Sequence, residues 1–111
     1  MNLNTAKNDL QDLQTILSKI GKVAGYVKVF NVEDNITSDI QKEFSNEVKS
    51  AKGIYLEFEI LPTSSIVAVN DVMCFINNNI DENCEVVFTT QTNEDLPQNS
   101  IKCKILFTGL V

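Results

Sequence analysis

The sequence predicts an α/β fold, a two-layer sandwich in which helices cover one face of a four-stranded mixed sheet. Apolar residues recur at helical spacing in three segments, and four short segments have the alternation or the Val and aromatic content of strands. These segments alternate along the chain as helix, strand, helix, strand, helix, strand, strand, an order typical of two-layer sandwiches. A length of 111 residues with 43% hydrophobic content suits one compact core. We therefore expect a single domain covering residues 1–111.

The first helix is expected at residues 8–20 and the first strand at residues 23–30. The helix is indicated by apolar residues at helical spacing: Leu10, Leu13, Ile16, Leu17 and Ile20. Asn8 is a suitable N-cap and Gly21 a suitable stop. The strand is short and rich in Val and aromatic residues, and a polar turn at residues 31–35 ends it.

A change in the spacing of the apolar residues predicts a second helix followed by a second strand. Apolar residues first stand four apart, which predicts a helix with one narrow buried stripe: Ile36, Ile40, Phe44 and Val48. From Gly53 the period becomes two, so one face of the strand carries Ile54, Leu56, Phe58 and Ile60. Its other face carries Tyr55, Glu57 and Glu59, which we expect to be solvated. Pro62 ends the strand because proline cannot donate to the sheet.

A third helix is expected from apolar residues at helical spacing: Val69, Val72, Met73, Ile76 and Ile80. Two strands follow, near residues 85–90 and 101–107, and the loop between them is too short for a crossover helix. We therefore predict that they form an antiparallel hairpin. Residues that should face inward in the last strand are Ile101, Cys103, Ile105 and Phe107. Lys102 and Lys104 should face outward, where they would pair weakly with Glu57 and Glu59 if the two strands are neighbours.

Charge and hydropathy exclude two classes of partner. Acidic residues exceed basic ones by 15 to 9, giving a formal charge of −6, and the lysines are scattered singly. Phosphate binding needs a surplus of basic residues on one face, so we expect no nucleic-acid partner. No apolar stretch approaches the roughly 20 residues of a membrane span, and the first residues do not resemble a secretory signal. A cytoplasmic location is expected.

The sequence lacks the residue types that several catalytic mechanisms require. Histidine is absent, which removes the Ser-His and Cys-His nucleophile arrangements. The three cysteines, Cys74, Cys84 and Cys103, are widely spaced within apolar runs, so we expect buried structural thiols and neither disulfides nor a metal site. The four glycines are isolated, so no phosphate-cradling loop is present. We expect a chain that binds no cofactor and is not an enzyme on its own.

The segment from Glu85 to Val111 resembles the end of the C-terminal domain of FtsZ, the bacterial tubulin-like cell-division GTPase. The resembling features are the apolar run ending in Phe88-Thr89-Thr90, an acidic turn, and a last strand closing on Thr108-Gly109-Leu110. Upstream, Ala51-Lys52-Gly53-Ile54 is similar to the family's Ala-Arg-Gly-apolar entry into a strand. The resemblance runs from about Asp9 to Leu110 and implies a four-stranded sheet with two helices against it. The chain departs from the family at Leu61-Pro62 and at Thr89, where FtsZ usually has glycine.

The resemblance also implies a role for Asp9 and Asp12. In FtsZ the corresponding loop contains Asn-x-Asp-x-x-Asp, whose carboxylates reach the GTP bound to the next subunit and help to polarise the attacking water. Lys7 stands at the Asn position here, and Asn4 at the position of a preceding glycine. Two carboxylates three residues apart lie on one side of a helical turn and could together orient a water molecule. Alternatively, acids in a first turn only offset the helix dipole.

The function implied by the resemblance is that of a polymerisation domain of a cell-division or cytoskeletal GTPase. Its partners would be FtsZ-like subunits, an FtsZ N-terminal GTP-binding domain, and other cell-division proteins at the septum, with GTP held by the neighbouring subunit. An alternative is a stand-alone two-layer interaction or regulatory module, including a filament cap, with no catalysis. An independent enzyme is disfavoured by the missing histidine, glycine-rich loop and metal cluster.

Overall fold

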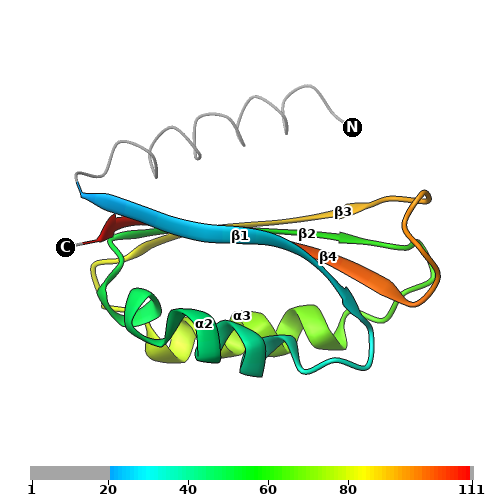
Figure 1. Cartoon of the computed structure of the whole chain (residues 1–111), viewed down its shortest axis with the longest axis horizontal. Coiled ribbons are helices and arrows are strands. Elements are labelled where there is room, and N and C mark those ends of the chain that lie inside the picture. The colour runs from blue at the N-terminus through cyan, green and yellow to red at the C-terminus, as the bar shows by residue number, and fades with distance from the viewer. Residues whose placement is uncertain (1–20, 111) are drawn as a thin grey trace.

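A computed structural model describes residues 21–110, which form a four-stranded mixed sheet with two helices on one face (Figure 1). The predicted two-layer α/β sandwich is thereby confirmed. In chain order the elements are β1 (Lys22–Asn31), α2 (Ile36–Ser50), β2 (Gly53–Ile60), α3 (Val67–Asn79), β3 (Glu85–Thr92) and β4 (Ser100–Leu110). The helix predicted for residues 8–20, with Asp9 and Asp12, lies outside the described residues.

The strand order is β1-β4-β2-β3, with β4 antiparallel to both of its neighbours and β2 parallel to β3. The predicted hairpin of the last two strands is therefore wrong, because β2 lies between them. The connection passes over the end of β2, where the amide of Asn93 donates to the carbonyl of Ile60 over 2.8 Å. It reaches β1 as well, since the amide of Val32 donates to the carbonyl of Asn99 over 2.8 Å. A seven-residue loop, 93–99, is too short for a helix but long enough to pass one strand.

The core lies between the sheet and the helices. Inward positions predicted for β2 and β4 are buried in this core: Ile54, Leu56, Phe58, Ile60, Ile101, Cys103, Ile105 and Phe107. The helices contribute the apolar residues predicted from their periodicity, including Ile36, Ile40 and Val48 from α2 and Val69, Val72 and Ile76 from α3. The faces of these elements are therefore those that the sequence predicts.

Helix α2 begins with a side-chain cap and bends near its middle. The Asn35 side chain accepts a hydrogen bond from the amide of Ser38 over 3.0 Å, which satisfies one of the free amides of the first turn. Phe44 has non-helical backbone angles, φ −133° and ψ 32°. Its ring lies between Tyr26, with centroids 5.0 Å apart, and Phe107, with centroids 4.9 Å apart. This aromatic contact joins α2 to β1 and β4.

The cysteines differ in their burial. Cys103 is buried in the core, Cys84 is half-buried and Cys74 is exposed on α3. The prediction of buried thiols holds for Cys103 and is wrong for Cys74. Cys74 stands beside apolar residues in the sequence, but it lies on the side of α3 that faces water, whereas Val72 and Ile76 face the core. In residues 21–110 no helix is long and apolar enough to cross a membrane.

Candidate functional site

Gly21 is the first described residue, and it follows the segment that contains Asp9 and Asp12. It lies beside the end of β4. Gly21 has a φ of +132°, a value that favours glycine, and a Cβ here would collide with the carbonyl oxygen of Leu110. Asp9 and Asp12 lie beyond this point, outside the described residues. Their proposed role therefore stays a prediction.

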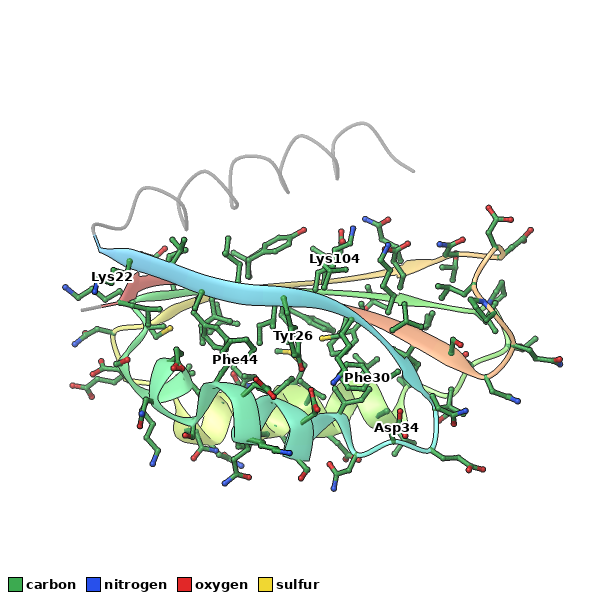
Figure 2. The ribbon with its side chains drawn as sticks, in the orientation of Figure 1. Lys22, Tyr26, Phe30, Asp34, Phe44 and Lys104 are labelled. Carbon is green, nitrogen blue, oxygen red and sulfur yellow. The ribbon has the colours of Figure 1, made fainter. Side chains whose placement is uncertain are left out.

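A charged network lies on the outer face of the sheet, defined here as the face away from α2 and α3. Lys104 Nζ lies 2.9 Å from a carboxylate oxygen of Glu57 and 3.4 Å from one of Glu59, and Lys102 Nζ lies 3.6 Å from Glu59. Figure 2 shows Lys104 on the side of the sheet opposite the helices. The predicted pairing is confirmed because β2 and β4 are neighbours whose register sets Glu57 opposite Lys104 and Glu59 opposite Lys102.

The two carboxylates of this network are less exposed than we predicted. The side chains of Glu57 and Glu59 are 11% and 14% exposed, because β2 has a strand on each side. Gln91 Nε2 donates to Glu57 over 3.2 Å, and Asn93 Nδ2 donates to Glu59 over 2.9 Å. The spacing of residues in β2 does not reveal these amides, since they come from β3 and the loop after it.

The pKa shifts in this network favour the charged forms. Partial burial alone would raise the pKa of Glu59, but the hydrogen bond from Asn93 and the charges of Lys102 and Lys104 lower it below its ordinary value. The hydrogen bond to Glu57 is the largest cause of a raised pKa at Lys104. Both shifts stabilise the ion pairs, which join β2 to β4.

A second polar cluster lies between β1 and α2. The Tyr26 hydroxyl donates to Asp39 Oδ2 over 2.8 Å, and Lys28 Nζ lies 3.0 Å from Asp39 Oδ1. Tyr26 lies on the helix side of β1 (Figure 2). Burial, followed by the bond to Asp39, raises the pKa of Tyr26 far above its ordinary range. Partial burial would raise the pKa of Asp39, but the bonds from Lys28 and Tyr26 lower it. The cluster fastens the first turn of α2 to the sheet.

A hollow of about 470 Å³ opens at the loop end of the sandwich. The β1–α2 turn, the β2–α3 loop, the start of α3 and the β3–β4 loop surround it. Asp34 and Asp71 are the charged residues in its lining, which contains no basic residue. Two carboxylates without a cation oppose phosphate binding. In the described part of the chain, no group of three or more potential metal ligands gathers at this hollow or elsewhere.

The arrangement of sheet and helices defines the class: it is a two-layer α/β fold with a four-stranded mixed sheet and two helices on one face. Solved structures with this fold include an empty FtsZ dimer from M. jannaschii, with a TM-score of 0.69 and 13% identity over 91% of this chain. They also include a mutant FtsZ from M. jannaschii, with a TM-score of 0.72 and 12% identity over 92% of this chain. The fold is therefore FtsZ-like. No protein-family model matches the sequence, and no curated protein matches it.

The matched region is one part of the FtsZ chains. This chain spans about a third of their length, 31% of one and 32% of the other.

Proposed function

We propose that this chain is the C-terminal polymerisation domain of an FtsZ-like cytoskeletal GTPase, which acts in the cytoplasm and offers acidic residues to the GTP site of the adjacent subunit. The observation that carries the proposal is the likeness to FtsZ over 92% of the chain at a TM-score of 0.72. The sequence resemblance supports it independently, because it extends to the segment before β1 where FtsZ has its catalytic carboxylates.

In this proposal Asp9 and Asp12 orient the water that attacks the γ-phosphate of GTP in the neighbouring subunit. Their carboxylates would accept hydrogen bonds from that water and favour its loss of a proton. The chain itself holds no GTP, since it lacks a glycine-rich phosphate loop and the hollow at the loop end of the sandwich carries two carboxylates. Partners are FtsZ-like subunits or an FtsZ-like GTP-binding domain, and other proteins of cell division.

The charged network on the outer face supports a rigid domain of this kind. A residue that acts on a neighbour's substrate must be held in place by its own subunit. Three ion pairs join β2 to β4, and the Tyr26–Asp39 bond joins β1 to α2. Gly21 sits against the end of β4, so the acidic segment starts from a position that the sheet holds.

The test separates GTP binding from GTP turnover. Asp9→Asn and Asp12→Asn are placed together in a full-length FtsZ-like protein that contains this domain, and both GTP affinity and steady-state hydrolysis are measured. We expect turnover to fall by about tenfold or more, at least 1.4 kcal/mol in the barrier, with affinity unchanged.

The matched control is Glu33→Gln, an exposed acid in the β1–α2 turn, which should leave both quantities unchanged. Turnover that survives the double substitution within about threefold would refute the catalytic role. Asp9 and Asp12 would then be charges at the end of a helix and nothing more.

A further inference from the structure

One edge of the sheet lacks the features that usually keep a sheet edge from pairing with another strand. Among residues 21–110, β3 pairs only with β2, so its other side, called here the β3 edge, has no strand beside it. Residues 86–92 of β3 are uncharged and include neither proline nor glycine. An edge strand of this composition is a template for pairing with another chain.

The opposite edge of the sheet, formed by β1, carries protective features. Lys22 and Lys28 lie on this strand, and the Lys28 ammonium group binds Asp39 on the helix side. The register of β1 with β4 also shifts between Lys22 and Ala24. Lysines and irregular pairing on an edge strand hinder the addition of a further strand. The chain thus protects the β1 edge and leaves the β3 edge free to pair.

Hydrogen bonds at the two ends of β3 show which of its backbone groups face the β3 edge. The amide of Glu85 donates to the carbonyl of Lys52 over 3.0 Å. The amide of Asn93 donates to the carbonyl of Ile60 over 2.8 Å. Backbone groups alternate between the two sides of a strand, so the odd-numbered residues of β3 bond to β2. The even-numbered residues direct their amides and carbonyls to the β3 edge: Val86, Phe88, Thr90 and Thr92.

We propose that two copies of this chain pair antiparallel through the β3 edge, about a two-fold axis at Thr89, and so join their sheets into one. An axis perpendicular to the sheet makes the contact the same for both copies and keeps all the helices on one face. Phe88 then lies opposite Thr90 of the second copy, and Val86 lies opposite Thr92. Every backbone group that faces the β3 edge in β3 thereby gains a hydrogen bond.

The backbone and the charges both favour this register and a second copy as the partner. A shift of two residues in either direction would leave some of the edge-facing groups of β3 opposite residues outside the strand. In the proposed register Glu85 lies opposite Asn93 of the second copy, so no carboxylate of β3 stands directly opposite another.

A buried hydroxyl supports the position of the axis. Thr89 stands beside Glu57 in the register of β2 and β3, and its Oγ1 is buried without a hydrogen-bond partner in the described part of the chain. At the axis the Thr89 side chains of the two copies form a pair without backbone hydrogen bonds, in which side chains approach closely. Cross-strand threonine pairs share hydroxyl hydrogen bonds. Rotation of Thr89 toward the axis therefore gains a partner for Oγ1.

Phe88 supplies an apolar contact on the other face of the same pair. It stands beside Leu56 in the register, and its ring centroid lies 6.1 Å from that of Phe58, which places it on the helix side of the sheet. Phe88 is nevertheless 38% exposed, so the helices do not cover it fully. In the proposed dimer the two Phe88 side chains are diagonal neighbours across the axis, within reach of each other. Burial of these rings favours association.

The first test traps the two copies at the axis. In a Cys74→Ser, Cys84→Ser background, Thr89→Cys sets two thiols opposite each other, with Cα atoms about 4.5 Å apart, a separation that a disulfide spans. Val87→Cys is the matched control, since Val87 is also half-buried and lies on the same face. Its thiols would be about 14 Å apart, too far for a disulfide. After mild oxidation, we expect at least about fivefold more covalent dimer from Thr89→Cys on a non-reducing gel.

The second test measures the dimer at equilibrium. One pair of strands is smaller than a standard interface, so we expect a dissociation constant of about 10–100 µM in sedimentation equilibrium of the parent chain. Thr90→Pro removes an amide that faces the β3 edge and should weaken the dimer by about tenfold or more. Thr90→Val keeps this amide and should stay within about threefold. If circular dichroism shows that Thr90→Pro is unfolded, Thr90→Lys takes its place.

Equal cross-linking of the two cysteine variants, or a parent chain that stays monomeric up to about 500 µM, would overturn the inference. A monomeric chain that instead binds an extended peptide at the β3 edge would overturn it too, because the partner would then be a different chain. The inference goes beyond the proposed function, whose contact joins the acidic segment of one subunit to the GTP site of another. Since neither test uses GTP, failure here leaves the proposed function untouched.

Discussion

Lys104→Ala should destabilise the fold, although a lysine on the outer face of a sheet suggests a silent position. Its ammonium group lies 2.9 Å from Glu57 and 3.4 Å from Glu59, whose side chains are mostly buried. Removing it leaves Glu57 with neutral donors and Glu59 with Lys102 and Asn93. A charged hydrogen bond contributes about 1.5–3 kcal/mol, and an exposed ion pair about 0–1. Because Lys104 itself is 38% exposed, we expect a cost of about 1–2 kcal/mol.

Urea denaturation measures this cost. Lys22→Ala, at the exposed start of β1, is the matched control and should change the free energy of unfolding by less than about 0.5 kcal/mol. A double-mutant cycle with Glu57→Gln then isolates the pair, and its coupling energy should be about 1 kcal/mol. If Lys104→Ala is as mild as Lys22→Ala, the low exposure of the carboxylates does not strengthen the network, and our reasoning from burial is wrong.

Three further predictions concern the core, the acid dependence of stability and the ligand. Phe58→Ala should cost about 3–5 kcal/mol and Ile105→Ala about 2–5 in urea melts, because both side chains are buried in the core; small costs at both would place them outside it. The pKa of Asp39 is lowered in the folded chain, so its charge stabilises the fold above its unfolded pKa of about 4, and this contribution is lost as the pH falls through the lower folded value. Asp39→Asn should therefore flatten the loss of stability below about pH 4, and an unchanged slope would contradict the shift. The isolated chain should show no GTP binding by calorimetry, and micromolar affinity, about −8 kcal/mol, would refute the assignment of the nucleotide to another domain.

The sequence predicts most elements of this fold well because α2, β2, α3 and β4 each have a clear local period. Alternation in β2 and β4 identifies the buried faces, and the pairing of Glu57 with Lys104 follows once the two strands are neighbours. Local periodicity cannot predict the strand order, because the order depends on contacts between residues far apart in the chain. The predicted hairpin of β3 and β4 failed for this reason: a short loop limits distance but does not say whether a strand lies between its ends.

The polar clusters were predicted only in part for the same reason. The helical spacing of α2 predicts that Asp39 lies on its polar side in water. In the structure, however, Tyr26 and Lys28 on β1 donate hydrogen bonds to it. No spacing in the sequence relates these residues, since the contact exists only after α2 packs on the sheet. Asp9 and Asp12 were proposed from the family resemblance and remain a prediction.

The central place of β4 affects the order in which this protein can form during synthesis. Strand β1 pairs within the described sheet only with β4, which is the last of the described strands to leave the ribosome. Until β4 emerges, β1 has no strand beside it, while β2 and β3 can already pair around α3. The two parts of the sheet therefore join in one late step that closes contacts distant in sequence, a kind of step that slows folding. The nascent chain would depend on chaperones at this stage, because the edges of its strands stay open until β4 has emerged.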